Sequence, residues 1–240
     1  MKKMIGKIVA RILMFGALTA YSTEEAVAAL ATDIVGRVAI SSFSEMIDAL
    51  EFPPILDEEE KLWVLSTPDG EASFWWRSEA NLHRHMLDVQ ICFEAEPFVN
   101  AGLDLDKLPE EMKGMLDAGR LMMGKQLSQG SLVYAGEITP LSSFEQIVRL
   151  DRDSIGYHAA ADHYKITVAG GLSDGWIFMW AKDMSTNAGD IVFALEPTIL
   201  IGAGVDPDKV EGWTFRKVPM MDERGRNFEV DKFVKAFDLR

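Results

Sequence analysis

The residues best suited to chemistry in this chain are two glutamates in matching segments. Residues 90–97 read QICFEAEP and residues 190–197 read DIVFALEP, so Glu96 and Glu196 each precede a proline, which holds the preceding residue extended. If the two segments converge in the fold, the carboxylates could act as an acid/base pair or bind a hard metal ion. Alternatively, each glutamate only ends a strand on its solvent face, where proline stops the hydrogen-bond ladder.

The four histidines are the second group that could bind a metal ion. His83 and His85 would share one face of a strand, and His158 and His163 lie close together in the sequence. Brought together, these imidazoles would suit zinc or copper. The chain lacks a third-ligand motif such as HExxH, so we expect no metal or other cofactor. A metal-dependent hydrolase that uses the histidines with a glutamate is an alternative interpretation.

Aromatic residues indicate a binding site of a different kind. The segments SFWW at residues 73–76 and IFMW at residues 177–180 place matched aromatic pairs on one strand face, which we expect in the core. The residues between them face the other way, so either helices cover both faces of the sheet or one face lines a pocket or a partner surface. An apolar cavity between sheet and helices would suit a hydrophobic small molecule. The ligand-binding residues that we expect are Trp75, Met179, Met112, Met115, Glu96 and Glu196.

The composition limits the classes of partner. The 240 residues carry a formal net charge of −14, which argues against nucleic acid, because binding the phosphate backbone needs a basic surface. The one cysteine, Cys92, excludes an intrachain disulfide. The sequence contains no nucleophile elbow, P-loop or dinucleotide-binding glycine motif. It therefore predicts a non-catalytic protein that binds an apolar small molecule or a protein partner.

Residues 1–22 differ in charge from the rest of the chain, because they contain four basic residues and no acidic one. A basic start followed by an apolar run and small residues is typical of a signal peptide, which would export the protein to the cell envelope of a bacterium. Alternatively, these residues form a basic amphipathic helix that lies on a membrane or docks a cytoplasmic protein, as a structural subunit, into a larger assembly. The sequence has no uninterrupted apolar stretch of about 20 residues that could span a membrane.

Further matches in the same order indicate a tandem duplication. Ser-Ser-Phe occurs at residues 41–43 and 142–144, and GLDLDKL at residues 102–108 matches GVDPDKV at residues 204–210. The Asp-x-Asp-Lys strings lack the further ligands that a calcium-binding loop requires, so we interpret them as helix caps.

We expect an α+β fold of two repeats, residues 23–130 and 131–240, which share one core about a pseudo-twofold axis. Each repeat would supply a helix and about three antiparallel strands, and Pro109 would open a methionine-rich helix. The expected helices cover residues 26–35, 43–50, 109–123, 144–150 and 231–237, and the expected strands cover residues 62–65, 73–76, 90–95, 164–168, 176–180 and 190–195.

Overall fold

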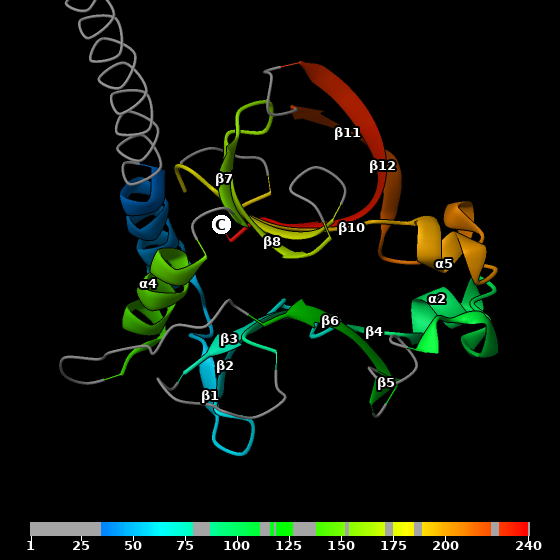
Figure 1. Cartoon of the computed structure of the whole chain (residues 1–240), viewed down its shortest axis with the longest axis horizontal. Helices are drawn as coiled ribbons and strands as arrows, with labels where there is room; N and C mark the ends of the chain where they lie inside the picture. Colours follow the sequence, from blue (N-terminus) through cyan, green and yellow to red (C-terminus); the bar gives the residue numbers. More distant parts are fainter. Residues whose placement is uncertain are drawn as a thin grey trace, which may run out of the picture.

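The computed structural model is an α+β structure with two antiparallel sheets of six strands each. The sheets lie face to face, with two longer helices at one end and two short helices at the other (Figure 1). The structure describes residues 35–78, 87–110, 116–117, 119–126, 138–151, 154–170, 175–184, 189–221 and 226–239. The N-terminal segment of residues 1–22 lies outside these residues. So do four of the expected site residues, His83, His85, Met112 and Met115.

The two sheets have the same strand order relative to the chain. The first sheet runs β1 (Ile55–Asp57), β2 (Leu62–Ser66), β3 (Ala72–Arg77), β4 (Val89–Glu94), β6 (Arg120–Lys125) and β5 (Leu116–Asp117). The second sheet runs β7 (Ile155–His158), β8 (His163–Ala169), β9 (Trp176–Ala181), β10 (Ile191–Leu195), β12 (Asn227–Phe237) and β11 (Thr214–Met221). The helices are residues 35–49, α4 (Pro140–Leu150), α2 (Glu96–Asn100) and α5 (Thr198–Gly202), with single 3-10 turns at η1 (Leu105–Lys107) and η3 (Pro207–Lys209).

One apolar core lies between the inner faces of the sheets and contains residues from both halves of the chain. The expected strand over residues 90–95 is present as β4, and Ile91 and Phe93 point into this core; Gln90 and Cys92, which the alternation places on the opposite face, are buried rather than exposed to solvent. The Phe74 and Phe178 rings stack at the centre with their centroids 4.3 Å apart and their planes 2° apart. Burial of so many aromatic rings supplies the main favourable term for folding.

Each longer helix forms hydrogen bonds with the sheet of the opposite half. Ser42, on the helix of residues 35–49, donates from Oγ to the Ala181 carbonyl of β9 at 2.6 Å. Ser143, on α4, donates from Oγ to the Arg77 carbonyl of β3. Two tryptophans add hydrogen bonds between the halves in the same way: Trp180 Nε1 donates to the Ala39 carbonyl, and Trp76 Nε1 donates to the Pro140 carbonyl. The two halves are therefore interlocked.

Two matched glycines meet where α2 and α5 end. Gly102 and Gly204 have φ values of +104° and +108°, which glycine adopts without strain. A Cβ atom on either glycine would lie 2.8 Å from the carbonyl oxygen of the other. The backbone next to them pairs reciprocally, because Asp104 N–H donates to the Ala203 carbonyl and Asp206 N–H to the Ala101 carbonyl. Close contact between the two segments thus requires both glycines.

The strand hairpins that end the two sheets differ in length. Strands β5 and β6 contain two and six residues, whereas β11 and β12 contain eight and eleven. The longer hairpin bends back over the outer face of the second sheet (Figure 1) and buries a second apolar cluster there. His158 Nε2 of β7 lies 2.5 Å from the Pro219 carbonyl of β11, so the two edges of this sheet meet.

Several expected elements differ from the structure. Residues 120–123, the end of the helix expected over 109–123, lie in strand β6, and residues 231–237 lie in strand β12 rather than in a helix; each half supplies six strands rather than about three. Both segments pair along their length with neighbouring strands, and this pairing overrides a weak local preference for helix. The expected caps at Asp104 and Asp206 are confirmed, since each carboxylate accepts a hydrogen bond from the backbone N–H two residues later. Among the described residues, no helix is long and apolar enough to cross a membrane.

Candidate functional site

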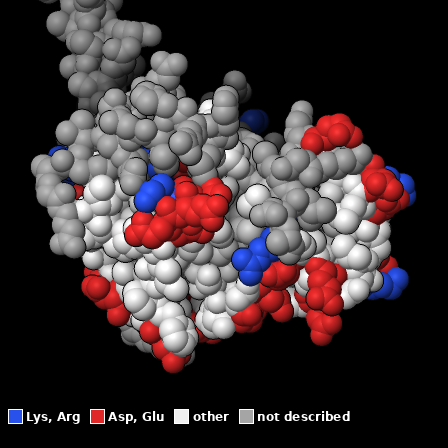
Figure 2. Space-filling view, turned by 90° about the horizontal axis from the view of Figure 1, so that it is seen from below, with Lys and Arg blue, Asp and Glu red and all other residues white. Residues whose placement is uncertain are grey.

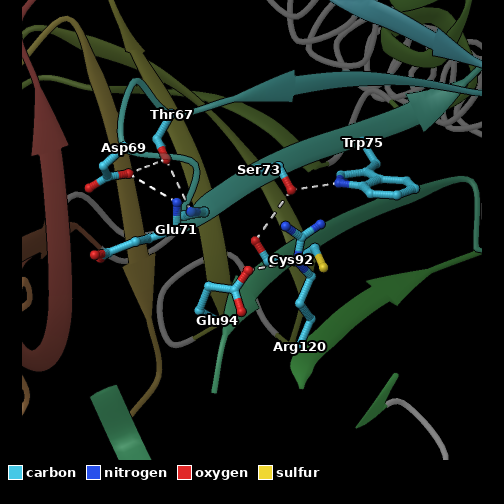
Figure 3. Close-up of polar contacts among 9 residues, drawn as sticks. Thr67, Asp69, Glu71, Ser73, Trp75, Cys92, Glu94 and Arg120 are labelled. Carbon is cyan, nitrogen blue, oxygen red and sulfur yellow. Dashed lines mark hydrogen bonds and ion pairs between the residues drawn. The ribbon is translucent and has the colours of Figure 1, made fainter. Parts of the chain in front are cut away.

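Trp75 lies on the outer face of the first sheet, away from the shared core. The register pairs Trp75 of β3 with Val64 of β2, and Val64 with Ile55 of β1, so the three side chains form an apolar row across the strands. Trp75 and Val64 are half-buried and Ile55 is 69% exposed. The Trp75 Nε1 donates to Ser73 Oγ at 2.6 Å (Figure 3), which fixes the orientation of the indole on this face.

The corresponding face of the second sheet is buried. Met179 and Ile177 of β9 are 5% and 1% exposed, and they pack with Val218 and Met220 of β11. Trp75 and Met179 therefore lie on the outer faces of different sheets and do not line one cavity, contrary to the expectation from the sequence. Among the described residues, β11 and β12 form a hairpin long enough to cover the second face, whereas β5 and β6 are shorter. Within the described residues, the first sheet has no counterpart of the second apolar cluster.

An acidic hollow of about 350 Å³ lies at one end of the first sheet, where β3 begins and β4 ends. Glu94 projects from β4 on the same side as Cys92, and the Glu71 backbone carbonyl accepts a hydrogen bond from Glu94 N–H. Glu96, from the first turn of α2, and Glu211, from the segment after η3, complete the lining together with Pro97 and Asn100. Residues from both halves of the chain thus form this hollow.

Basic side chains neutralise part of the charge in the hollow. Arg120 of β6 donates from Nε to Glu94 Oε1 at 2.8 Å (Figure 3), and this hydrogen bond raises the pKa of Arg120 above its ordinary value. The Lys235 ammonium, 5% exposed, pairs with Glu71 and lies 2.8 Å from Asp69 Oδ2. Seen from the side of the first sheet, the surface carries several groups of Asp and Glu with few Lys or Arg among them (Figure 2).

Glu196 lines a different hollow from Glu96, one of about 600 Å³ that also includes Phe215 and Lys232. Its Oε1 accepts hydrogen bonds from the Thr198 backbone N–H, at 3.0 Å, and from the Thr198 hydroxyl. Glu196 therefore accepts from the first residue of α5, from a position before the N-cap residue Pro197. The two glutamates of the Glu-Pro motifs do not share a hollow, so the structure does not form the carboxylate pair considered from the sequence.

The rings of His158 and His163 are held by the backbone. The His158 Nδ1 accepts from the Ala161 N–H at 3.2 Å, and its Nε2 faces the Pro219 carbonyl. Burial is the main reason that the pKa of His158 lies below its ordinary value of 6.5, which favours a neutral ring. Both ring nitrogens of His163 face backbone carbonyls, those of Ala161 and Gly189. Among the described residues, no group of three or more His, Cys, Asp or Glu side chains is placed to hold a metal ion.

Sequence reasoning missed Glu71, Glu94 and Glu211 as members of a common site. Glu71 and Glu94 meet through the pairing of β3 with β4, and Glu211 reaches them from the other half of the chain. The outward direction of Glu94 was available from the alternation of residues 90–95, but no local pattern connects it to Glu211. Searches against models of protein families, curated proteins and solved structures found no match to this chain.

Proposed function

We propose that this chain is a non-catalytic binding protein built from two copies of one α+β unit, and that it holds a protein partner on the outer face of its first sheet. The observation that carries the proposal is the difference between the two outer faces. The hairpin of its own sheet covers one face, whereas on the other face the described residues place no such hairpin over Ile55, Val64 and Trp75.

The arrangement of the two sheets supports the duplication. Their strand orders correspond one to one, and the exchange of Ser42 and Ser143 between the halves is reciprocal. Corresponding positions on the outer faces differ in polarity, because Ser73 and Cys92 stand where the second sheet has Ile177 and Val192. Apolar residues in the second sheet suit burial under a hairpin. Ser73 and Cys92 are themselves buried, at 6% and 2% exposed, so the part of this face that a partner would contact is the row of Ile55, Val64 and Trp75.

A row of side chains that crosses three strands favours a protein partner over a small molecule. A small ligand needs a concave site that buries most of its surface, whereas the Trp75 row extends across three strands up to the edge strand β1. Tryptophan is among the residues most enriched in the centres of protein interfaces, since its ring buries a large area at a small entropic cost.

The experiment places a photo-crosslinking amino acid at Ile55, on the proposed face, in the protein expressed in its native host. Tyr157, which is 37% exposed on β7 of the second sheet, gives the control position. A protein that crosslinks through residue 55 but not through residue 157 is then purified, and its affinity is measured by titration calorimetry. We expect Trp75→Ala to weaken this affinity at least tenfold and Tyr157→Ala to leave it unchanged. Equal crosslinking at both positions, or an unchanged affinity in Trp75→Ala, would refute the proposal.

A further inference from the structure

The end of the β11–β12 hairpin lies over the second sheet without pairing to the strands beneath it. Residues 233–237 of β12 pair with β10, whereas residues 227–232 pair with β11 alone. We name residues 217–221 and 227–231, which pair only with each other, the hairpin tip. Strands β7 and β11 are the two edges of this sheet, and among the described residues no backbone hydrogen bond joins them.

The hairpin tip covers the second apolar cluster. Val218 and Met220 of the tip are 8% and 4% exposed, and they pack against Ile177 and Met179 of β9. This cluster is separate from the core that lies between the two sheets. Displacement of the tip would therefore expose apolar side chains of the second sheet and leave the core between the sheets intact.

His158 of β7 connects the hairpin tip to the opposite edge of the sheet. Its Nδ1 accepts a hydrogen bond from the Ala161 N–H at 3.2 Å, so this nitrogen carries no proton in the closed structure. The neutral ring then has its proton on Nε2, which donates to the Pro219 carbonyl at 2.5 Å. A proton added at Nδ1 would face the Ala161 N–H, so the charged ring loses one of its two contacts. Pro219 has no N–H of its own, and a side chain rather than a strand makes this contact.

The surroundings of His158 oppose a positive charge on its ring. Burial lowers the pKa of His158, the hydrogen bond to the Pro219 carbonyl acts against this, and Lys165 and His163 of β8 lower the pKa further. On the hairpin, the carboxylate that pairs with Pro219 is Glu229, which is exposed and therefore screened by water. The closed structure thus favours the neutral ring, and a ring released into water takes up a proton more readily.

We propose that the hairpin tip is a lid that neutral His158 holds closed, and that protonation of His158 opens the lid and exposes the second apolar cluster. Lys232 donates from Nζ to the Gly175 carbonyl at 2.8 Å and holds the base of the hairpin, so the tip moves about residues 232–233. The lid belongs to the second sheet and acts independently of the partner proposed for the first sheet.

The size of the effect follows from the protonation of the released ring. A histidine in water has a pKa of about 6.5, so protonated rings outnumber neutral ones about tenfold at pH 5.5, and the ratio is reversed at pH 7.5. If the closed state keeps His158 neutral, the population of the open state rises by up to about tenfold between pH 7.5 and pH 5.5.

The test measures the oxidation of methionines by hydrogen peroxide at pH 7.5 and pH 5.5, followed by mass spectrometry of peptides. We expect the rates of Met179 and Met220 to rise about five- to tenfold at the lower pH. Met46, fully buried in the core between the sheets, is the internal control and should react slowly at both pH values. In His158→Gln, whose amide stays neutral and can donate to the Pro219 carbonyl, the rates should not depend on pH.

Three outcomes would overturn the lid. Equal rates for Met179 and Met220 at the two pH values would show that the tip does not open. A parallel rise at Met46 would show that the whole molecule unfolds. The same rise in His158→Gln would show that another group controls the opening. The comparison with Met46 needs only the wild-type protein, so a variant that does not fold leaves the test intact.

Discussion

The exchange of helices between the two halves makes a prediction about how the protein unfolds. Ser42 is 3% exposed and Ser143 is fully buried, and each hydroxyl donates to a carbonyl on the sheet of the opposite half. We expect Ser42→Ala and Ser143→Ala each to destabilise the whole molecule, because the helix that loses a contact holds a sheet from the other half.

The magnitude follows from the burial of the hydrogen bonds. Removing the donor from a buried carbonyl costs about 1–3 kcal/mol. For a protein of this size, 1 kcal/mol corresponds to about 2–4 °C in the unfolding midpoint, so each variant should unfold about 2–12 °C lower. Ser41→Ala is the matched control, since Ser41 is exposed on the same helix and alanine favours helix. Its midpoint should stay within about 2 °C of the wild type, as an exposed substitution is worth at most about 0.5 kcal/mol.

The assay is thermal unfolding followed both by far-ultraviolet circular dichroism and by tryptophan fluorescence. The two signals should change together in one transition, in the wild type and in both variants, because one core and reciprocal contacts connect the halves. Two separate transitions, of which Ser143→Ala shifts only one, would refute the interlocked arrangement.

Two further predictions concern the closest backbone contact and the edge of the second sheet. Gly102→Ala and Gly204→Ala should each lower the free energy of unfolding, measured by urea denaturation, by more than about 1 kcal/mol. Alanine is strained at positive φ, and its Cβ would lie 2.8 Å from a carbonyl oxygen. Equal stability of the variants and the wild type would contradict the close contact. Burial lowers the pKa of His158 below 6.5, and the nearby charges of Lys165 and His163 lower it as well. Below about pH 6.5, the unfolded chain therefore binds a proton that the folded chain does not. The free energy of unfolding should therefore fall between pH 7.5 and pH 5, and His158→Gln should reduce the fall; an unchanged pH dependence in that variant would refute this role of His158.

Part of the fold could be predicted from the sequence because its signals are local. The alternation of residues 90–95 indicated a strand with Ile91 and Phe93 in the core, and the structure places them there. The opposite directions of Trp75 and its two neighbours followed from the period of a strand in the same way. The sequence also indicated helices over residues 43–50 and 144–150, and both are present within longer helices.

The missed strands show where local signals fail. Residues 121–123 form a short apolar run whose period does not distinguish strand from helix. Gly119 precedes this run with φ +85° and was a signal for the hairpin between β5 and β6. Residues 231–237 begin with an aspartate that suits a helix cap, yet they pair with both β10 and β11. Pairing partners on both sides decided the conformation, and no local pattern specifies them.

The candidate site depends on features that only the fold reveals. The direction of Trp75 could be predicted, but the burial of Met179 at the matching position depends on a hairpin far along the chain. The acidic hollow joins Glu94 to Glu211, which are more than 100 residues apart and meet only because the two halves pack together. Matching positions also took different roles, as Glu96 and Glu196 show.

The most direct test of the binding face is hydroxyl-radical footprinting of the free protein and of its complex with the captured partner. We predict that Trp75 and Met122, both half-buried on the first sheet, are oxidised in the free protein and protected in the complex. Met179, 5% exposed under its hairpin, should react slowly in both states. Oxidation of Trp75 at the same rate with and without the partner would contradict the claim that the partner binds this face.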